Sequence, residues 1–308
     1  MKTVFMIDGG AGRAIAAIPA LIKYSKSNPD FRVIVHGWDT LYWGIPELHD
    51  KVFNPDQKGA FEQFFMGADR VLSPEPYRVP GYYRQEKSLA EAFDYLINET
   101  DDHSDLSLPV IKTNKNEELQ AANFIRETKQ QQQKQKTIII QPFGRSMEKP
   151  QEGVLLDQSS RSINPDTYIK LVKKLSTKYN LVLFAEKNFW MEEDTYTMKP
   201  EADLRMWSAF IDAADYFIGC DSVGQHMARA MNKPGTVIVG STFAVNTSYP
   251  DYFNIIERDV QKKYSPIRIS GLESHLADRA NEATVEFTDE EINKIYESIV
   301  KDIEKKVK

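Results

Sequence analysis

The stretch DYFIGCDSVGQHMARAMNKPGTVIVGST, residues 215–242, decides the fold of this chain. Its first apolar run, residues 216–218, is typical of a strand buried on both faces of a parallel sheet. Asp221-Ser222 follows as a helix start, because either side chain can cap free backbone N–H groups. A helix with apolar residues at core-facing spacing comes next, and a second apolar strand spans residues 236–239. The alternation of strand, helix and strand predicts an α/β fold.

A strand that enters a helix through a turn of small residues forms a ready anion site. The first-turn N–H groups of such a helix are unpaired, and the helix dipole favours negative charge. Here Ser222, Gly224 and Gln225 allow a phosphate to approach closely. His226, one turn into the helix, can donate a hydrogen bond to that phosphate. The alternative interpretation is a helix cap followed by a surface histidine without a ligand.

The composition is typical of a soluble globular protein, with 41% hydrophobic and 27% charged residues among 308. This length is enough for two domains with proper cores, and no apolar run is long enough to predict a membrane span. The net charge of −6 gives no general basic surface for nucleic acid or an anionic membrane. The N-terminus leads directly into a strand without a signal peptide, and the single cysteine, Cys220, excludes an internal disulfide. We therefore expect a cytoplasmic protein.

The N-terminal residues predict a second β-α-β unit. Apolar strands are expected at residues 2–7 and 31–35, with a helix at 14–26 between them. The turn at residues 8–13 is rich in glycine, but it is a poor dinucleotide-binding fingerprint. It lacks the third glycine, and His36 rather than an acidic residue follows the second strand. The unit predicts a Rossmann-like, doubly wound domain, and a tight turn without function is the alternative interpretation of its glycines.

The pattern Asp-Ser-x-x-x-His-x-Ala-x-Ala begins at Asp221 and precedes a strand that ends in Gly-Ser-Thr. It resembles the donor-phosphate loop of the heptosyltransferase-like glycosyltransferases of family 9. Residues 19–21, Pro-Ala-Leu, are also similar to that family's first helix. The family usually has Gly-Pro after Asp-Ser, where this chain has Val223-Gly224. The resemblance implies the GT-B fold, in which two Rossmann-like, doubly wound α/β domains face a cleft.

The expected domains follow from this resemblance and from a polar tract near the middle of the chain. Residues 1–130 form the acceptor-side domain, and residues 131–136 form the linker. Residues 137–287 form the domain that binds the nucleotide-sugar. A capping box starts a final helix at 288–308, which in GT-B folds commonly crosses back toward the first domain. Within the first domain, further elements are expected at residues 56–67 (helix) and 110–111 (strand).

The resemblance implies a glycosyltransferase that moves a sugar from a nucleotide-sugar donor to an acceptor hydroxyl. No Asp-x-Asp motif is present in the sequence. We therefore expect no metal and no other cofactor, the departing diphosphate being stabilised by a helix dipole and cationic side chains. The implied donor-binding residues are Gly144, Arg145, Arg161, Glu186, Asp221, Ser222, Gly224, Gln225 and His226.

One departure from the family concerns the general base. Where the family has an acidic residue after the glycine, this chain has Arg13, which is always charged and cannot act as a base. The candidate catalytic residues are therefore Asp8, His36 and Asp39, which follow the first two strands. Arg13 is expected to bind an anionic acceptor or a donor phosphate instead. The acceptor-side residues are Gly10, Gly12, Arg13, Trp38 and Tyr42, although a tryptophan here is as compatible with core packing as with a ligand.

Several alternatives remain open for the activity. The acceptor is a glycan, or a hydroxymethylated or already modified base in DNA, as for phage-type DNA glycosyltransferases. In the second case the aromatic loops at residues 38–43 and 77–83 hold a base flipped out of the duplex. The same fold also suits a nucleotide-sugar epimerase or hydrolase, which needs no separate acceptor, and a non-catalytic nucleotide-sugar binder.

Overall fold

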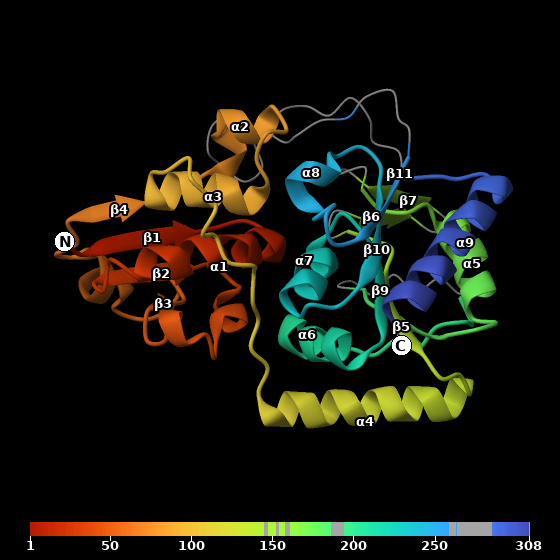
Figure 1. Ribbon diagram of the computed structural model, residues 1–308. Helices are drawn as coiled ribbons and strands as arrows, with labels where there is room; N and C mark the ends of the chain where they lie inside the picture. The colour runs from red at the N-terminus through yellow and green to blue at the C-terminus, as the bar shows by residue number, and fades with distance from the viewer. Residues whose placement is uncertain are drawn as a thin grey trace. The chain divides into compact units, whose positions relative to one another are not determined.

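The computed structural model describes residues 1–144, 147–151, 154–157, 161–185, 194–258, 263 and 285–307, with the backbone alone for 147–151 and 154–156. The chain forms two compact units, which are described separately (Figure 1). The described residues of the first unit are Met1–Asn114. Those of the second unit lie within Lys115–Tyr264 and Asp278–Lys308.

The first unit contains a four-stranded parallel sheet with the strand order β3-β2-β1-β4. This is the order of one half of a Rossmann fold. Its strands are β1 (Thr3–Ile7), β2 (Phe31–Val35), β3 (Val52–Phe53) and β4 (Arg70–Leu72). Its helical segments are α1 (Ala11–Ser25), η1 (Asp39–Tyr42), η2 (Pro46–Leu48), η3 (Phe61–Phe65), η4 (Pro76–Arg78), α2 (Pro80–Tyr83) and α3 (Leu89–Asn98).

The two faces of this first sheet differ in their cover. Helices α1 and α3 pack together on one face, where Tyr24 contacts Phe5 edge to face and donates a hydrogen bond from its hydroxyl to Thr3. On the other face, Val4 belongs to a small apolar cluster with the η3 segment. Met6 remains 38% exposed on that face. The sheet is therefore buried on its α1 side and only partly covered on the other.

Three details of the first unit differ from the sequence prediction. Helix α1 begins at Ala11, so the glycine turn is three residues shorter than expected. The predicted helix at residues 56–67 is only the π-helical turn η3, because Gly59 and Gly67, both at positive φ, stop it on either side. The predicted strand at residues 110–111 does not form in the described structure, since this segment pairs with no strand there.

The second unit contains a five-stranded parallel sheet with the order β11-β10-β9-β5-β8 and an antiparallel hairpin of two strands, β6 and β7. The sheet strands are β5 (Thr137–Gln141), β8 (Asn180–Leu183), β9 (Tyr216–Cys220), β10 (Gly235–Val239) and β11 (Asn254–Glu257). The hairpin strands are β6 (Met147–Gln151) and β7 (Val154–Asp157). The helices are α4 (Lys115–Gln132), α5 (Pro165–Leu175), α6 (Leu204–Ala213), α7 (Val223–Ala230), α8 (Ala244–Thr247) and α9 (Asp289–Lys306).

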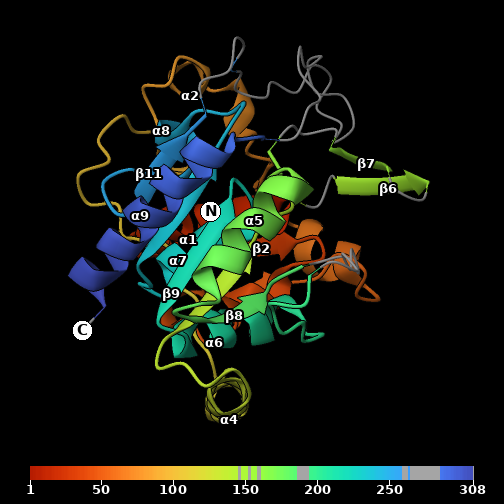
Figure 2. The ribbon, with the colours of Figure 1, turned by 90° about the vertical axis from the view of Figure 1, so that its right-hand side faces the viewer.

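Helices cover both faces of the second sheet, as a doubly wound fold requires (Figures 1 and 2). Helices α5 and α9 pack together on one face, and α6 packs with both α4 and α7 on the other. The core on the α5–α9 side contains Ile138, Ile140, Tyr168, Tyr216 and Ile218. Read in chain order within this unit, the strands run 2-1-3-4-5, the flavodoxin-like order. The strand order therefore reverses between β5 and β9.

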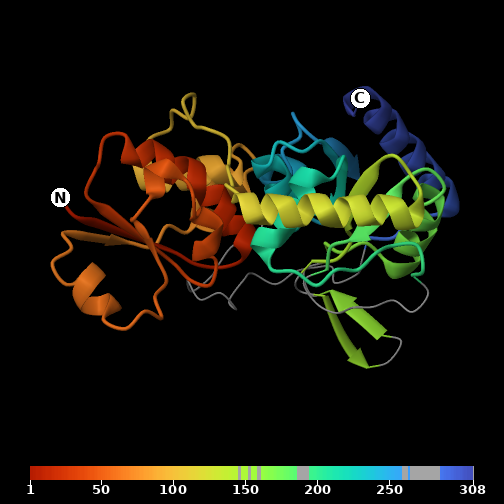
Figure 3. The same cartoon turned by 90° about the horizontal axis from the view of Figure 1, so that it is seen from below.

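The boundary between the units lies before α4, at Asn114 and Lys115, rather than at the expected linker of residues 131–136. Helix α4 runs along the second unit (Figure 3) and packs on α6 through Phe124 and Phe210, whose ring centroids are 4.6 Å apart. The glutamine-rich tract only completes this helix and leads into β5.

The last helix follows the sequence prediction at its start. Thr288 accepts a hydrogen bond from the Glu291 N–H, and the Glu291 carboxylate accepts one from the Thr288 N–H, which completes the capping box. Ile292, Ile295 and Ile299 of α9 are buried in the core of the second unit. The expected crossing toward the first domain stays a prediction.

Candidate functional site

The β9–α7 turn stands at the point where the strand order of the second sheet reverses. Open α/β sheets bind ligands at the carboxyl ends of the strands that flank such a point. Here those ends belong to β5 and β9, and Gln141 of β5 lies opposite Gly219 of β9 in the register. Asp221 and Ser222 follow β9 and are 3% and 8% exposed. The residues predicted to bind a donor phosphate therefore occupy the position that topology favours.

Two glycines allow this turn to form. A Cβ atom at Gly219 would lie 2.5 Å from the Phe217 ring. One at Gly224 would lie 2.7 Å from the same ring and 2.3 Å from the Gln141 Oε1 atom. Both distances are far below van der Waals contact, so the helix N-terminus can approach β5 and the Phe217 ring only because these residues lack a side chain.

Gln141 caps the first turn of α7. Its Oε1 atom accepts a hydrogen bond from the Gly224 N–H at 2.7 Å, and its Nε2 donates one to the Ser222 Oγ at 3.4 Å. Ser222 is the N-cap residue but makes no capping bond with its own side chain. The expectation that the first-turn N–H groups are unpaired is thus corrected for Gly224. No local pattern singles out Gln141, because it reaches the turn through the β5–β9 register.

The Asp221 carboxylate is held by two neutral donors. The Gln225 Nε2 donates to its Oδ1 at 2.6 Å, and the Thr242 hydroxyl donates to its Oδ2 at 2.7 Å. Gln225 is fully buried, and its Oε1 has no hydrogen-bond partner among the described residues. Asp221 therefore ties α7 to the end of β10, and a buried acceptor stands beside it. Thr242 ends the Gly-Ser-Thr run that the sequence pattern had marked only as a strand end.

His226 is 5% exposed and contacts Tyr249, which follows α8. The His226 Nδ1 lies 2.8 Å from the Tyr249 hydroxyl oxygen. Burial lowers the pKa of His226 to about 4; Arg161 lowers it further and Asp221 opposes this shift. Burial raises the pKa of the Tyr249 hydroxyl. Near neutral pH both side chains are thus uncharged, and His226 is not the surface histidine of the alternative interpretation.

Arg161 and Gly144 lie on the loops beside this turn. The Asp157 carboxylate accepts hydrogen bonds from the N–H groups of Arg161 and Ser162, at 2.9 and 2.6 Å. The Ser162 hydroxyl in turn accepts from the Gly144 N–H at 2.9 Å. The Arg161 guanidinium lowers the pKa of His226, so its charge reaches the α7 turn. Two other predicted donor-binding residues, Arg145 and Glu186, lie outside the described residues.

Arg13 is paired within the first unit. It is 4% exposed, and its guanidinium forms ion pairs with Asp8 at 3.1 Å and with Glu75 at 3.3 Å. It also stacks over the Tyr77 ring at 4.9 Å from the centroid. Two carboxylates of the same unit therefore balance its charge, and the binding of an anionic ligand by Arg13 stays a prediction.

Asp8, His36 and Asp39 follow the neighbouring strands β1 and β2, as predicted. The Asp8 side chain is 43% exposed. His36 is exposed, and Asp39 accepts a hydrogen bond from the Asn54 side chain at 3.2 Å. The topology therefore brings all three candidates to one edge of the sheet, with Asp8 both paired and accessible.

The predicted acceptor-side residues have different environments. Tyr42 is 2% exposed and donates a hydrogen bond to the Ala14 carbonyl at 2.6 Å, so its ring packs in the core of the first unit. The Trp38 indole N–H donates to the Gly9 carbonyl at 2.9 Å and ties two loops together. Gly10 is the N-cap of α1, with open space around it, and Gly12 lies in the first turn of that helix.

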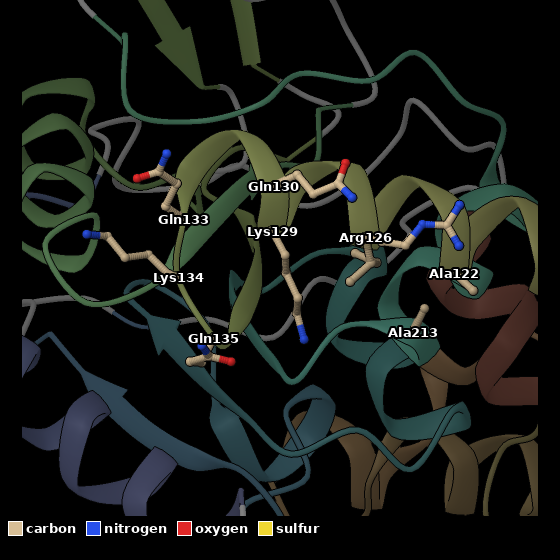
Figure 4. A pocket seen from close by; sticks show the side chains of 9 residues that line it. Ala122, Arg126, Lys129, Gln130, Gln133, Lys134, Gln135 and Ala213 are labelled. Atoms are coloured by element: carbon tan, nitrogen blue, oxygen red, sulfur yellow. The ribbon is translucent and has the colours of Figure 1, made fainter.

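A groove of about 610 Å³ lies at the opposite end of the second sheet (Figure 4). It is lined by the last turns of α4, which precede β5, and by Ala213 at the end of α6, which precedes β9. Its charged lining residues are Arg126, Lys129 and Lys134. The groove therefore borders the amino ends of the strands whose carboxyl ends carry the α7 turn, and none of the predicted site residues lines it.

Among the described residues, no group of three or more histidine, cysteine, aspartate or glutamate side chains could hold a metal ion. No helix in the described part of the chain is long and apolar enough to cross a membrane.

The chain is similar to several solved structures over most of its length. For ADP-heptose LPS heptosyltransferase II from E. coli, the TM-score is 0.64 at 15% identity, covering 99% of both chains. For a family 9 glycosyltransferase from Veillonella parvula, the TM-score is 0.62 at 12% identity, covering 83% of this chain and 86% of the other. For the iron-containing dodecameric glycosyltransferase TibC from enterotoxigenic E. coli, the TM-score is 0.62 at 10% identity, covering 99% of this chain and 78% of the other.

No protein-family model matches the sequence, and a search of curated proteins gave no match. The likeness to the solved structures therefore rests on architecture. It extends over both units and includes the two parallel sheets. The chain has the GT-B fold of the heptosyltransferase-like family 9 glycosyltransferases.

Proposed function

We propose that the protein is a glycosyltransferase, which moves a sugar from a nucleotide-sugar held by the second unit to an acceptor hydroxyl. The observation that carries this proposal is the β9–α7 turn, whose helix N-terminus stands at the switch point of the second sheet. The shared fold with an ADP-heptose LPS heptosyltransferase supports it and makes ADP-heptose the first donor to test.

The α7 turn is proposed to stabilise the departing diphosphate. Arg161 supplies positive charge near the turn, and the neutral imidazole of His226 supplies a hydrogen-bond donor. Because Gln141 occupies the Gly224 N–H, the other first-turn N–H groups and the helix dipole provide the remaining stabilisation. None of these interactions needs a divalent ion. Transfer is therefore proposed to be metal-independent, to be measured with EDTA and with added ions, since TibC contains iron.

Asp8 is the proposed general base. Its side chain is 43% exposed at the end of β1 while it pairs with Arg13, and Asp39, which accepts a hydrogen bond from Asn54, is the alternative base. The acceptor hydroxyl gives its proton to the Asp8 carboxylate and its oxygen bonds to the anomeric carbon. The bond from that carbon to the diphosphate breaks, and the nucleoside diphosphate leaves with the electron pair. A glycan and a hydroxymethylated DNA base are the two acceptor classes to be compared.

Donor binding is tested first, by melting the full chain with ADP, UDP, GDP or CMP, and then with the corresponding sugar nucleotides. A ligand that binds the folded state raises Tm by mass action, and we expect the largest rise with ADP or ADP-heptose. No rise with any nucleotide at millimolar concentration would contradict the donor site at the α7 turn.

Transfer is tested next with Asp8→Asn. We expect transfer to fall by about a hundredfold or more, because the asparagine cannot accept the proton, while donor binding is retained. Asp30→Asn, the same change at an exposed carboxylate directly before β2, is the matched control and is expected to keep its activity. Full activity in Asp8→Asn would remove Asp8 as the base and leave donor binding unaffected.

A further inference from the structure

We propose that Tyr249 is a positioning residue, which fixes His226 in the tautomer with the proton on Nε2. His226 then presents one neutral N–H donor toward the leaving diphosphate. This inference rests on the proposed function for the identity of the ligand. The tautomer itself is a property of the free protein and can be measured independently.

The hydrogen bond between the two side chains admits two arrangements. Either the Tyr249 hydroxyl donates to Nδ1, which leaves the proton on Nε2, or Nδ1 donates to the phenol oxygen, which leaves a lone pair on Nε2. A phenol is the better donor and an imidazole nitrogen the better acceptor, so the first arrangement is favoured. Burial keeps the Tyr249 hydroxyl protonated and therefore able to donate, because it raises the pKa of that group.

The surroundings of His226 leave Nε2 available for a ligand. No described residue makes a hydrogen bond to this atom, whereas Nδ1 is occupied by Tyr249 at 2.8 Å. Arg161 and Asp221 are the charged groups that act on the ring, with opposite effects on its pKa. In this proposal Arg161 supplies the positive charge, and His226 supplies a hydrogen-bond donor with a fixed orientation. An Nε2 lone pair would repel a phosphate oxygen at this position, whereas an Nε2–H would bind it.

The backbone of Tyr249 suggests that its position is maintained at a cost. Its φ of +49° lies in the left-handed region, which is unfavourable for a bulky residue. The ring is fixed by edge-to-face contacts with His226 and Phe253, at 5.6 and 6.2 Å between centroids. The strained turn therefore places the hydroxyl against Nδ1.

The tautomer is measured by ¹⁵N NMR of the full chain labelled at its five histidines, with His226→Gln used to assign the His226 signals. At pH 7 we expect a pyridine-type Nδ1 and a pyrrole-type Nε2 for His226. In Tyr249→Phe, which keeps the ring and removes the hydroxyl, we expect the two nitrogens to shift toward an average of both tautomers. A pyrrole-type Nδ1 in the unaltered protein would overturn the proposal.

The functional consequence is measured as kcat and donor Kd. Tyr249→Phe is expected to lower kcat by about tenfold with little change in donor Kd, because the donor bond gains most strength as the leaving group becomes charged. Tyr252→Phe is the matched control in the same segment, since its ring lies over Arg229 rather than against His226. It is expected to change neither quantity.

Two further outcomes separate this proposal from the proposed function. An unchanged kcat in Tyr249→Phe, with the tautomer also unchanged, would overturn the positioning role. Absence of any sugar transfer, together with the expected nitrogen signals, would contradict the transferase function and leave the proposed His226 tautomer standing.

His226→Gln places an amide N–H near the position of Nε2 and is expected to keep more activity than His226→Asn, whose amide lies nearer Nδ1.

Discussion

The β1–α1 turn and the β9–α7 turn are built alike and differ in what surrounds their polar groups. Each follows a buried parallel strand and starts a helix after a glycine or a small polar residue. In the first, Arg13 pairs with Asp8 and Glu75, and no described residue lies within 4 Å of a Cβ atom built at Gly10. In the second, Gly224 is packed against its neighbours, and the charge of Arg161 lowers the pKa of the His226 imidazole.

The same supersecondary unit therefore serves two purposes in this chain. In the first turn, the charge of Arg13 is paired within the fold and stabilises it. The second turn holds the neutral His226 and the Asp221 carboxylate, whose oxygens accept hydrogen bonds from two neutral donors, within reach of the Arg161 charge. A strand-turn-helix pattern alone therefore indicates where a ligand can bind, whereas the neighbours decide whether it does.

Arg13→Met tests the structural role of the first turn and has the largest expected effect. Removing one partner of a buried ion pair leaves Asp8 and Glu75 uncompensated, so we expect the free energy of unfolding to fall by about 3 kcal/mol. Arg161→Met is its counterpart beside the second turn, where nucleotide affinity is expected to fall more than stability. Denaturant unfolding and nucleotide titration of both variants measure the two effects. Equal stability of Arg13→Met and the unaltered protein would show that the first cation does not support the fold.

Gly224→Ala and Gly10→Ala compare the packing of the two helix starts. The added methyl group at position 224 meets Phe217 and Gln141, and overpacking of this kind costs about 2 kcal/mol. At position 10 no residue of the described part of the chain lies within 4 Å of the new Cβ, so we expect little change. Thermal unfolding with and without ADP measures both variants. A nucleotide response retained in Gly224→Ala would place the ligand away from this turn.

The pH dependence of stability tests the burial of His226 at the second turn. Between its unfolded pKa near 6.5 and its folded value of about 4, His226 binds a proton in the unfolded chain and not in the folded one. Its contribution is complete above pH 6.5 and is lost as the pH falls toward 4, by about 1 kcal/mol between pH 7.5 and 5.5. His226→Gln should lose less stability over this range than the unaltered protein. Identical slopes for the two proteins would show that His226 titrates normally.

Gln141→Met removes the cap of the second turn and has the smallest expected effect. The methionine is similar in volume but cannot accept the Gly224 N–H bond, so stability should fall by about 1 kcal/mol. A phosphate can then take the freed N–H, and ADP should raise Tm more in this variant than in the unaltered protein. A smaller rise would mean that Gln141 assists the nucleotide rather than competing with it.

Local sequence patterns predicted the elements that are determined by residues close together in the sequence. The β9–α7 turn, the capping box at Thr288 and the α/β architecture were all expected from residue types and spacing, and the structure confirms them. Gln141 and Tyr249 were missed, because strand register and a left-handed turn bring them to the site from distant parts of the chain. The ion pairs of Arg13 could not be predicted either, because Glu75 lies on a distant segment of the chain.

Cys220, the single cysteine, is fully buried at the end of β9, directly before the α7 turn. Burial shields its thiol from reagents and raises the pKa of that thiol. Alkylating reagents, which react with the thiolate, therefore modify Cys220 only when this region opens. The rate at which Cys220 is alkylated under native conditions therefore reports how often the turn opens, and no engineered label is needed. A nucleotide that closes the turn would lower this rate, so a mass-spectrometric time course can follow nucleotide occupancy in the unmodified chain.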